Sequence, residues 1–407
     1  MTQHPHPAAP QEVELKLALG PGALDALLAH PLLAEPPQQQ ALANTYFDTP
    51  QGHLAAGRVA VRLRRLGPRV LQTVKTAGQG GGGLSRREEW EWPLDEHALD
   101  QAGLAALEAG QDVLPASTIE AIAHHGVALK GPCTTPVGEG FTSINVQLRQ
   151  KLNLFAAVRP VRNLPGVTTR FDGVDLVIIR ENTEGLYSGV ENQVTADVVM
   201  SMKVATQTAC DRIARWGFRF ATCRGRKKIT VFHKANIMKL TDGLFLRCAR
   251  QVHQAEYPNI EYEEVIIDAG CMKLVQDPSQ FDVLMLENLY GDVVSDLCAG
   301  LVGGLGVVPG ANIGEELAVF EAVHGSAPDI AGRGVANPLA VSMSSVMMLN
   351  HLAETRDDPS CREAGERIKV AYNLALADGC LTRDLGGNLD TEGFVNEVVD
   401  RIEGSSS

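Results

Sequence analysis

The sequence lacks the features that mark membrane, secreted or nucleic-acid-binding proteins. No apolar run reaches the roughly 18 residues that a membrane-spanning helix requires. The opening MTQHPHPAAP has neither the basic nor the apolar region of a secretory signal. A net charge of −13 argues against a nucleic-acid or polyanion role for the surface as a whole. We therefore expect a cytoplasmic protein with no membrane or nucleic-acid partner.

Two further motifs are absent. The 8 cysteines are scattered without a C-x-x-C pair, so neither a zinc site nor a disulfide framework is indicated. Reduced thiols in a cytosolic enzyme are the simplest account. The glycine-rich stretch at 300–310 does not follow a strand and open a helix, as a dinucleotide-binding turn would. We interpret it as loop packing.

The first hundred residues and the rest of the chain have different patterns. EVELKLAL (12–19), VAVRLRRL (59–66) and REEWEWPL (87–94) alternate charged and apolar residues, which predicts half-buried antiparallel strands. From about residue 104 the pattern changes. The length of 407 residues predicts two or three domains.

Buried strands alternate with helices in the second part. VDLVII (174–179) and FDVLML (281–286) are apolar runs between helical stretches, which is typical of an α/β layer fold. Residues 195–221 are predicted as one long amphipathic helix. Residues 99–110 are predicted as a helix that continues across the domain boundary without a linker.

Charged residues recur at alternate positions of the N-terminal strands. A solvated sheet face would explain them, but opposite signs on neighbouring strands also suit a tunnel that holds a polyphosphate and metal ions. The residues of this charged face are Glu12, Glu14, Lys16, Arg62, Arg64, Lys75, Arg87, Glu89 and Glu91.

This pattern of E-x-E-x-K, R-x-R, a lysine strand and R-x-E-x-E resembles the CYTH domain of the triphosphate tunnel metalloenzymes. Members bind or hydrolyse triphosphate compounds with Mg²⁺ or Mn²⁺. The resemblance covers roughly residues 10–95, the first half of such a domain. It implies a small antiparallel α+β fragment, because the strands that close the family's tunnel are not found.

Two aspartates lie four residues apart in ENLYGDVVSDLCAG (287–300). On a helix, Asp292 and Asp296 would share one face at roughly 5–6 Å between Cβ atoms. Such a pair suits either an acidic first turn at the positive end of a helix or a hard divalent cation such as Mg²⁺ or Mn²⁺. The spacing alone leaves both readings open.

Arginines occur beside hydroxyl and amide groups in two segments. SINVQLRQKLNLFAAVRP contains Ser143, Asn145, Arg149 and Arg159, and RENTEGLYSG contains Arg180 and Tyr187. Arginine pairs bidentately with carboxylate, so these segments suit a small polycarboxylate, although any single one could form a surface ion pair. Two more candidates are Lys234, directly after a buried-type strand, and Asp268 at a strand end.

Together these motifs resemble the β-decarboxylating dehydrogenases, the isocitrate and isopropylmalate dehydrogenase family. S-x-N-x-x-x-R at 143–149 and R-E-N-T-E-G-x-Y at 180–187 resemble the isocitrate branch. The match covers about 104–402. It implies an α/β dehydrogenase fold with the following domains: a partial CYTH-like domain at 1–100, a large cofactor domain at 101–140 and 255–407, and a small substrate domain at 141–254.

The resemblance also implies the roles of the site residues. Asp292 and Asp296 match the metal ligands and are joined by Asp268 of the partner subunit, in a homodimer with shared sites. Lys234, also from the second subunit, helps remove the hydroxyl proton of isocitrate, and Tyr187 protonates the product of decarboxylation. The residues that orient the substrate are Ser143, Asn145, Arg149, Arg159 and Arg180.

The segment HGSAPDIAGRGVANP at 324–338 resembles the family's adenosine-binding loop. His324 and Asn337 would lie beside the adenine. Asp329 and Ile330 stand where NADP-using relatives carry Lys and Tyr. A carboxylate accepts hydrogen bonds from both ribose hydroxyls and repels a 2′-phosphate, so NAD is the predicted cofactor.

One family segment is missing from the sequence. Members begin with a strand and a Gly-Asp-Gly-Ile-Gly-Pro-Glu turn that leads into the first long helix, and here the CYTH-like residues stand in that place. We therefore expect the fold to lack its first strand and helix. Residues 12–92 should form a separate sheet, and the vacant position should leave a cleft beside the strands that precede Gly131 and Asp292.

Three functions remain open from the sequence. The leading one is NAD-dependent oxidative decarboxylation of isocitrate, impaired by the missing segment. The second is action on isopropylmalate or another 3-substituted malate. The third is a triphosphate-binding module whose dehydrogenase part is inactive.

Overall fold

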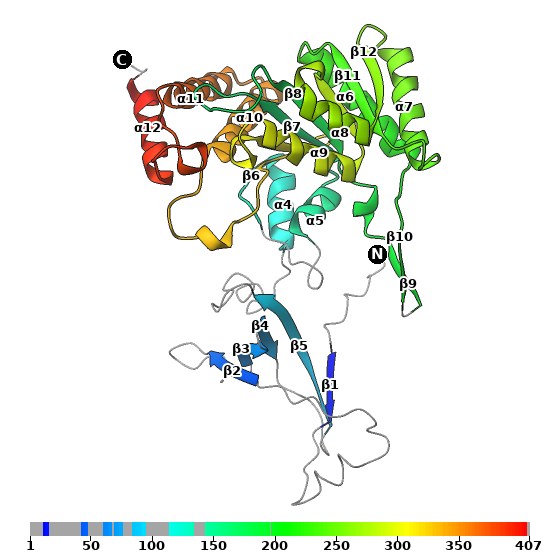
Figure 1. Cartoon of the computed structure of the whole chain (residues 1–407), viewed down its shortest axis with the longest axis vertical. Helices are drawn as coiled ribbons and strands as arrows, with labels where there is room; N and C mark the ends of the chain where they lie inside the picture. Colours follow the sequence, from blue (N-terminus) through cyan, green and yellow to red (C-terminus); the bar gives the residue numbers. More distant parts are fainter. Residues whose placement is uncertain are drawn as a thin grey trace, which may run out of the picture. The chain divides into compact units, whose positions relative to one another are not determined.

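The computed structural model describes residues 11–15, 42–47, 60–66, 69–75, 84–94, 114–133, 143–195 and 197–404. The chain divides into two compact units (Figure 1). One comprises Met1–Val113 with Pro136–Phe141, and the other comprises Leu114–Thr135 with Thr142–Ser407. The predicted helix at 99–110 lies outside the described residues.

The first unit contains a five-stranded antiparallel sheet in the order β1-β5-β4-β3-β2. The expected separate N-terminal sheet is therefore confirmed. Its strands are β1 (Gln11–Leu15), β2 (Leu42–Phe47), β3 (Ala60–Leu66), β4 (Arg69–Lys75) and β5 (Leu84–Leu94).

The register of this sheet aligns most of the charged positions singled out in the sequence. Residues paired across antiparallel strands share one face. Three of the resulting rows are Arg87 with Glu12, Lys75 with Glu89, and Arg62 with Thr73 and Glu91. Arg64 lies two residues beyond Arg62 on β3, and Glu14 lies two residues beyond Glu12 on β1, so both positions fall on the same face of the sheet. Lys16 lies outside the described residues. Both Arg62 and Thr73 are buried.

The second unit contains a mixed eight-stranded sheet in the order β12-β11-β13-β8-β7-β14-β15-β6. Neighbours from β12 to β8 are parallel, as are β15 and β6, whereas the pairs from β8 to β15 are antiparallel. The strands are β6 (Val127–Lys130), β7 (Ala156–Arg162), β8 (Asp175–Glu181), β11 (Lys228–His233), β12 (Glu261–Ile266), β13 (Val283–Leu286), β14 (Pro309–Ile313) and β15 (Ala318–Ala322).

Helices cover both faces of this sheet, so its central strands are buried on both sides (Figure 1). The helices are α4 (Ala116–His125), α5 (Ile144–Lys151), α6 (Gln207–Cys223), α7 (Thr241–Glu256), α8 (Ile267–Gln276), α9 (Asn288–Leu301), α10 (Leu339–Thr355), α11 (Pro359–Ala377) and α12 (Thr391–Gly404). In β8, Ile178 faces the core under α9, and its neighbours Val177 and Ile179 face the core under α6 and α7. In the described part of the chain no helix is long and apolar enough to cross a membrane.

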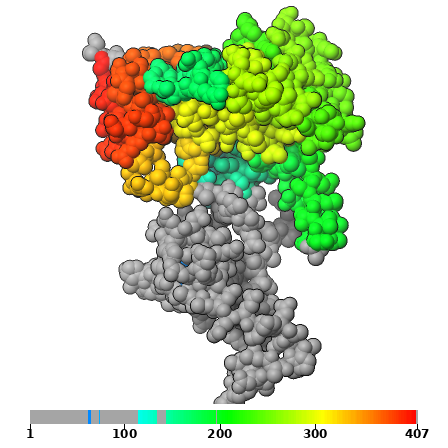
Figure 2. Space-filling model, viewed as in Figure 1, coloured from blue at the N-terminus to red at the C-terminus, as the bar shows by residue number. Residues whose placement is uncertain are grey.

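The prediction of one helix over 195–221 is wrong. Strands β9 (Glu191–Thr195) and β10 (Val198–Ser201) form a two-stranded arm that projects from the unit, and α6 begins only at Gln207 (Figures 1 and 2). The side chain of Thr206 caps the helix by accepting a hydrogen bond from Ala209 N at 3.2 Å. The β-branched residues before it favour strand.

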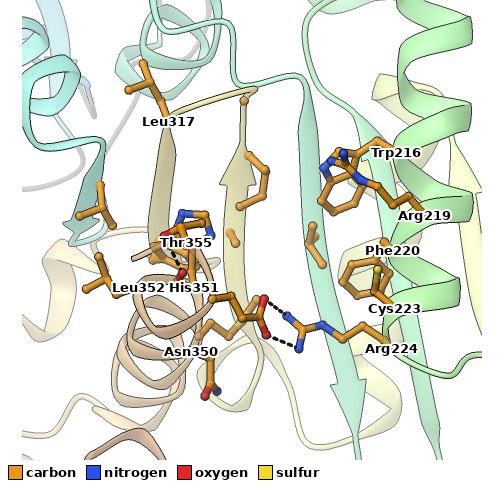
Figure 3. Close-up of a pocket in the computed structure, with 18 of the residues that line it drawn as sticks. Trp216, Arg219, Phe220, Cys223, Arg224, Leu317, Asn350, His351, Leu352 and Thr355 are labelled. Atoms are coloured by element: carbon orange, nitrogen blue, oxygen red, sulfur yellow. Dashed lines mark hydrogen bonds and ion pairs between the residues drawn. The ribbon is translucent and has the colours of Figure 1, made fainter. Parts of the chain in front are cut away.

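A hollow of about 1030 Å³ lies between α6 and α10 (Figure 3). Trp216 and Phe220 line it from α6, His351 lines it from α10, and Arg224 and Glu354 form an ion pair across it at 2.8 Å. The hollow borders β6, the strand before Gly131, as expected. It does not border β13, the strand before Asp292, because four strands separate β13 from β6 in the sheet. The glycine-rich stretch at 300–310 follows helix α9, as its interpretation as loop packing requires.

Candidate active site

Glu321 on β15 is the centre of a buried charged cluster. Its side chain contacts Lys130 Nζ at 2.9 Å and both Arg149 Nη2 and Arg159 Nη2 at 3.3 Å. It also accepts a hydrogen bond from Asn312 Nδ2 at 2.7 Å. Burial alone would raise the pKa of Glu321, but the neighbouring cations hold it far below its usual value. The carboxylate therefore stays ionised.

Glu321 does not use all the donors of its arginines. Arg159 is 3% exposed, and its Nη1 is buried without a hydrogen-bond partner, as is Nε of Arg149. Burial, partly offset by Glu321, lowers the pKa of Arg159 to about 10, so it is still cationic at neutral pH. A Cβ on Gly310 would lie 2.1 Å from Arg159 Nη1, so only glycine leaves room for this guanidinium. The cluster retains unpaired donors for an anion.

Ser143 and Asn145 lie at the start of α5, the helix that carries Arg149. Ser143 is the residue before the first turn, and Asn145 Oδ1 is buried without a hydrogen-bond partner. The structure therefore places the whole S-x-N-x-x-x-R pattern on one short helix beside Glu321.

A second cluster joins β8, α9 and the turn Leu186–Ser188. Arg180 is 2% exposed and donates from Nη2 to Asn288 Oδ1 at 2.7 Å. Its Nη1 donates to Asp292, which also accepts a hydrogen bond from the Tyr187 hydroxyl. Burial and the bond to Asp292 raise the pKa of Tyr187, so the phenol stays protonated.

Gly291 precedes Asp292 and allows this contact. A Cβ at Gly291 would lie 2.6 Å from Cβ and Cγ of Arg180, closer than real side chains approach. Glycine on this face of α9 lets β8 and α9 come close enough for Arg180 to reach Asp292.

Asp292 and Asp296 share a face of α9, as the spacing predicts. Burial would raise the pKa of Asp292, but Arg180 and the bond from Tyr187 lower it. Partial burial and the charge of Asp292 raise the pKa of Asp296. A cation beside both carboxylates would relieve this repulsion, and hard oxygen donors fit Mg²⁺ or Mn²⁺.

The third predicted metal ligand lies elsewhere in the chain. Asp268, on α8, accepts a hydrogen bond from Lys234 Nζ at 2.7 Å. Among the residues that the structure describes, no hydrogen bond or ion pair links either of them to Asp292, Asp296 or Tyr187, and no three acidic, His or Cys side chains gather as a metal group. Within one chain the site therefore presents two separate parts.

The predicted cofactor loop follows β15 on the surface of the second unit. Asp329 and Ile330 lie in the short 3₁₀ turn Pro328–Ile330, with Asp329 exposed. Asn337 donates to Asp384 Oδ2 at 2.9 Å, and His324 Nδ1 lies 2.9 Å from the carbonyl of Gly325. The exposed carboxylate is free to accept hydrogen bonds from ribose hydroxyls.

Sequence reasoning missed Lys130, Glu321 and Asn288. Lys130 ends the short strand VALK, and Glu321 interrupts the apolar run AVFEAV. A lone charge in a buried strand is costly unless it is paired, which is the argument that singled out Lys234. The same argument applied to both would have found them.

Two family models match this chain. The isocitrate/isopropylmalate dehydrogenase model covers residues 93–402, and the CYTH domain model covers residues 10–126. Both resemblances recognised in the sequence are therefore confirmed.

Individual relatives agree with the larger match. Isocitrate dehydrogenase [NAD] catalytic subunit 5, mitochondrial, from Arabidopsis thaliana is 48% identical over 83% of this chain and 86% of its own. The chloroplastic 3-isopropylmalate dehydrogenase of Solanum tuberosum is 56% identical over 64% of this chain and 71% of its own.

A solved structure shares the fold. The crystal structure of isocitrate dehydrogenase from Methylococcus capsulatus superposes with a TM-score of 0.69 and 46% identity, over 74% of this chain and 88% of that one. The predicted α/β dehydrogenase fold is confirmed. The chain therefore belongs to the isocitrate/isopropylmalate dehydrogenase family, as an isocitrate dehydrogenase-like enzyme.

Proposed function

We propose that this chain oxidatively decarboxylates isocitrate to 2-oxoglutarate with NAD and Mg²⁺ or Mn²⁺. The observation that carries the proposal is the contact of Tyr187 and Arg180 with Asp292. It joins a proton donor, a carboxylate-binding guanidinium and a candidate metal ligand at one point. Relatives named NAD isocitrate dehydrogenases support this substrate, and the potato relative supports isopropylmalate as the runner-up.

The arginines bind and orient the substrate. Arg149 and Arg159 each keep an unpaired buried donor for its carboxylates, and Arg180 adds a third guanidinium. Ser143 and Asn145 approach from the start of α5. Fixed geometry of this kind removes much of the entropic barrier to reaction.

Two side chains move protons. Lys234 takes the hydroxyl proton of isocitrate, and the protonated Tyr187 returns a proton after CO₂ leaves. A divalent cation held by Asp292, Asp296 and the partner subunit's Asp268 would act as a Lewis acid on the hydroxyl and its neighbouring carboxylate. NAD would accept the hydride.

The active form is a homodimer with shared sites. Exposed apolar side chains gather where a second copy would be needed: on the arm, on the loop after Lys234 and on the outer faces of α8 and α9. They include Val194, Val199, Met200, Ile237, Leu240, Met272 and Val293, which are between 50% and 84% exposed. Covering them in a dimer would bury this surface.

A complementation assay tests both catalysis and sharing. A Lys234→Met chain and a Tyr187→Phe chain, each inactive alone, should recover NADH formation from isocitrate when mixed. Each variant carries one intact half of a shared site. No recovery after confirmed subunit exchange would contradict sharing, and turnover of isopropylmalate instead of isocitrate would favour the runner-up.

NAD should be preferred over NADP because Asp329 is an exposed carboxylate in the cofactor loop. Comparison of kcat/KM with both cofactors checks this. Asp329→Lys should narrow the preference, with the exposed Glu315→Lys as a matched control outside the loop. A higher kcat/KM with NADP in the unmodified chain would contradict the assignment.

Turnover should be far below that of the intact Methylococcus capsulatus relative. The hollow between α6 and α10 supports this, because it leaves apolar side chains such as Trp216 and Phe220 only partly buried. The chain should also bind a dye for apolar surface more strongly than that relative. Equal turnover of the two enzymes would contradict impairment.

The N-terminal unit supports a second candidate activity, triphosphate binding. Its charged positions share one sheet face by register, and the CYTH model covers residues 10–126. Calorimetry with tripolyphosphate and Mg²⁺ tests it, with Arg62→Met as the variant that should weaken binding. Undetectable heat in the unmodified chain would exclude this activity.

We also propose a cytoplasmic location, because the 8 cysteines are all free, as in a reducing compartment, although several relatives are named mitochondrial. Cell fractionation of the full chain tests it. Recovery in a mitochondrial fraction would overturn it.

A further inference from the structure

A buried ion pair lies between the root of the arm and the loop that carries Lys234. Asp242, the second residue of α7, is 2% exposed. One of its oxygens, Oδ1, lies 2.5 Å from Lys203 Nζ. The other, Oδ2, accepts a hydrogen bond from the backbone N–H of Lys234 at 2.7 Å. A single carboxylate therefore ties the two segments together.

The cation of this pair also touches helix α9. Lys203 Nζ lies 4.5 Å from the ring centroid of Tyr290 and 3.7 Å from Oε2 of Glu287. Glu287 caps α9 by accepting hydrogen bonds from its first backbone N–H groups. Lys203 itself follows β10 by two residues. The arm, the loop that carries Lys234 and helix α9 thus meet around the ammonium group of Lys203.

From this geometry we infer that Asp242 is a positioning residue for Lys234, and that Lys203 makes the position of Lys234 depend on the arm. The importance of Asp242 for catalysis rests on the proposed function, in which Lys234 is the base. Asparagine cannot replace Asp242, because its single oxygen can face only one of the two donors and its NH₂ group would then face the other.

This arrangement links two events in the proposed dimer. The arm meets the partner subunit, and Lys234 serves the partner's site. A shift of the arm moves Lys203, which pulls on Asp242 and hence on the backbone of Lys234. Docking of the partner and placement of the base are coupled through one buried carboxylate.

Hydrogen exchange on the full-length protein tests the inference without an activity readout. Asp242→Asn and Lys203→Met should each raise exchange in peptides covering 234–240 by roughly tenfold, the effect of losing one charged hydrogen bond. The interior of β11 should be unaffected. Lys228→Met is the matched control, because it removes a 2.7 Å ion pair with Glu263 at the opposite end of the same strand.

One further variant and the distribution of the exchange separate the alternatives. Lys203→Arg keeps the charge and should retain protection close to that of the unmodified chain. If Asp242→Asn raised hydrogen exchange evenly over β11, α6 and α9, Asp242 would serve overall stability, and the inference would be overturned. So would unchanged exchange at 234–240 in Asp242→Asn.

Turnover then distinguishes this inference from the proposed function. Asp242→Asn should lower kcat for isocitrate with little change in KM, because substrate contacts are untouched. Faster exchange at 234–240 with unchanged kcat would leave the positioning role intact and refute Lys234 as the base.

Discussion

The two carboxylate clusters of the candidate active site have opposite charge balance. Glu321 is one carboxylate surrounded by three cationic side chains, Lys130, Arg149 and Arg159. Asp292 and Asp296 are two carboxylates that, among the residues described by the structure, form an ion pair with one cation, Arg180. The first cluster has positive charge to spare and the second has negative charge to spare. This difference suits a polyanionic substrate on one side and a metal ion on the other.

The same difference appears in proton affinity. Neighbouring cations lower the pKa of Glu321 despite its burial, whereas burial and a neighbouring carboxylate raise the pKa of Asp296. Exposure differs as well, since the side chain of Glu321 is 5% exposed and that of Asp292 is 42% exposed. The buried cluster is held in place by the fold and keeps unpaired donors on Arg149 and Arg159 for an anion, whereas the open cluster leaves its carboxylates accessible to a cation.

The largest expected effect comes from removing a cation from the buried cluster. Arg159→Met should lower the free energy of unfolding by about 3 kcal/mol, the lower end of the range for breaking a buried pair, because Lys130 and Arg149 remain. Urea denaturation at pH 7 measures it. Arg215→Met, which breaks an exposed pair with Glu256, should cost less than about 1 kcal/mol. Equal losses would contradict the comparison.

Removing the carboxylate of the same cluster should change acid stability. The folded-state pKa of Glu321 lies below its ordinary value of 4.5. Its ionised form therefore contributes fully to stability above about pH 4.5. That stabilisation is lost as the pH falls further toward the folded-state pKa. Glu321→Gln should therefore cost about 2 kcal/mol at pH 7, and progressively less in acid. Denaturation at a series of pH values checks this, and a difference independent of pH would argue against it.

The open cluster should respond in metal affinity instead. Asp292→Asn should weaken Mn²⁺ binding by at least about tenfold, the cost of losing even an outer-sphere partner. Titration followed by electron paramagnetic resonance measures this. Glu321→Gln makes the same chemical change in the buried cluster and should leave Mn²⁺ affinity unaltered. If both variants weakened binding equally, the two clusters would not be distinct.

The smallest expected effect has the opposite sign. The raised pKa of Asp296 means that its ionised form is disfavoured in the fold, so Asp296→Asn should stabilise the metal-free protein at pH 7. A rise in Tm of about 1–2 °C is expected for so exposed a group. Saturating Mn²⁺ should stabilise the unmodified chain more than the variant. A lower Tm without metal would show that Asp296 is not strained by its neighbour.

The sequence predicted those parts of the fold that depend on local pattern. The apolar runs at 174–179 and 281–286 became β8 and β13, and the spacing of Asp292 and Asp296 placed them on one helix face. The arm could not be predicted in this way. Its valines and methionines match one side of an amphipathic helix in the sequence, whereas the structure leaves them exposed on two short strands.

The cluster around Glu321 was also beyond local pattern. Glu321 lies far along the sequence from Lys130 and Arg149, and only the pairing of β6 with β15 and the packing of α5 bring the three together. The arginines were found because their carboxylate-binding chemistry and a family resemblance both singled them out. Their carboxylate partner carried no such signal.

Gly291 has a consequence for attempts to engineer this protein. Replacing a glycine inside a helix with alanine is a standard stabilising change, worth about 1 kcal/mol in helix propensity. Here the added methyl group would collide with the stem of Arg180 and separate it from Asp292. A variant selected for thermal resistance alone could therefore gain helix stability and lose the contact on which the proposed function rests. Any such library should hold position 291 fixed.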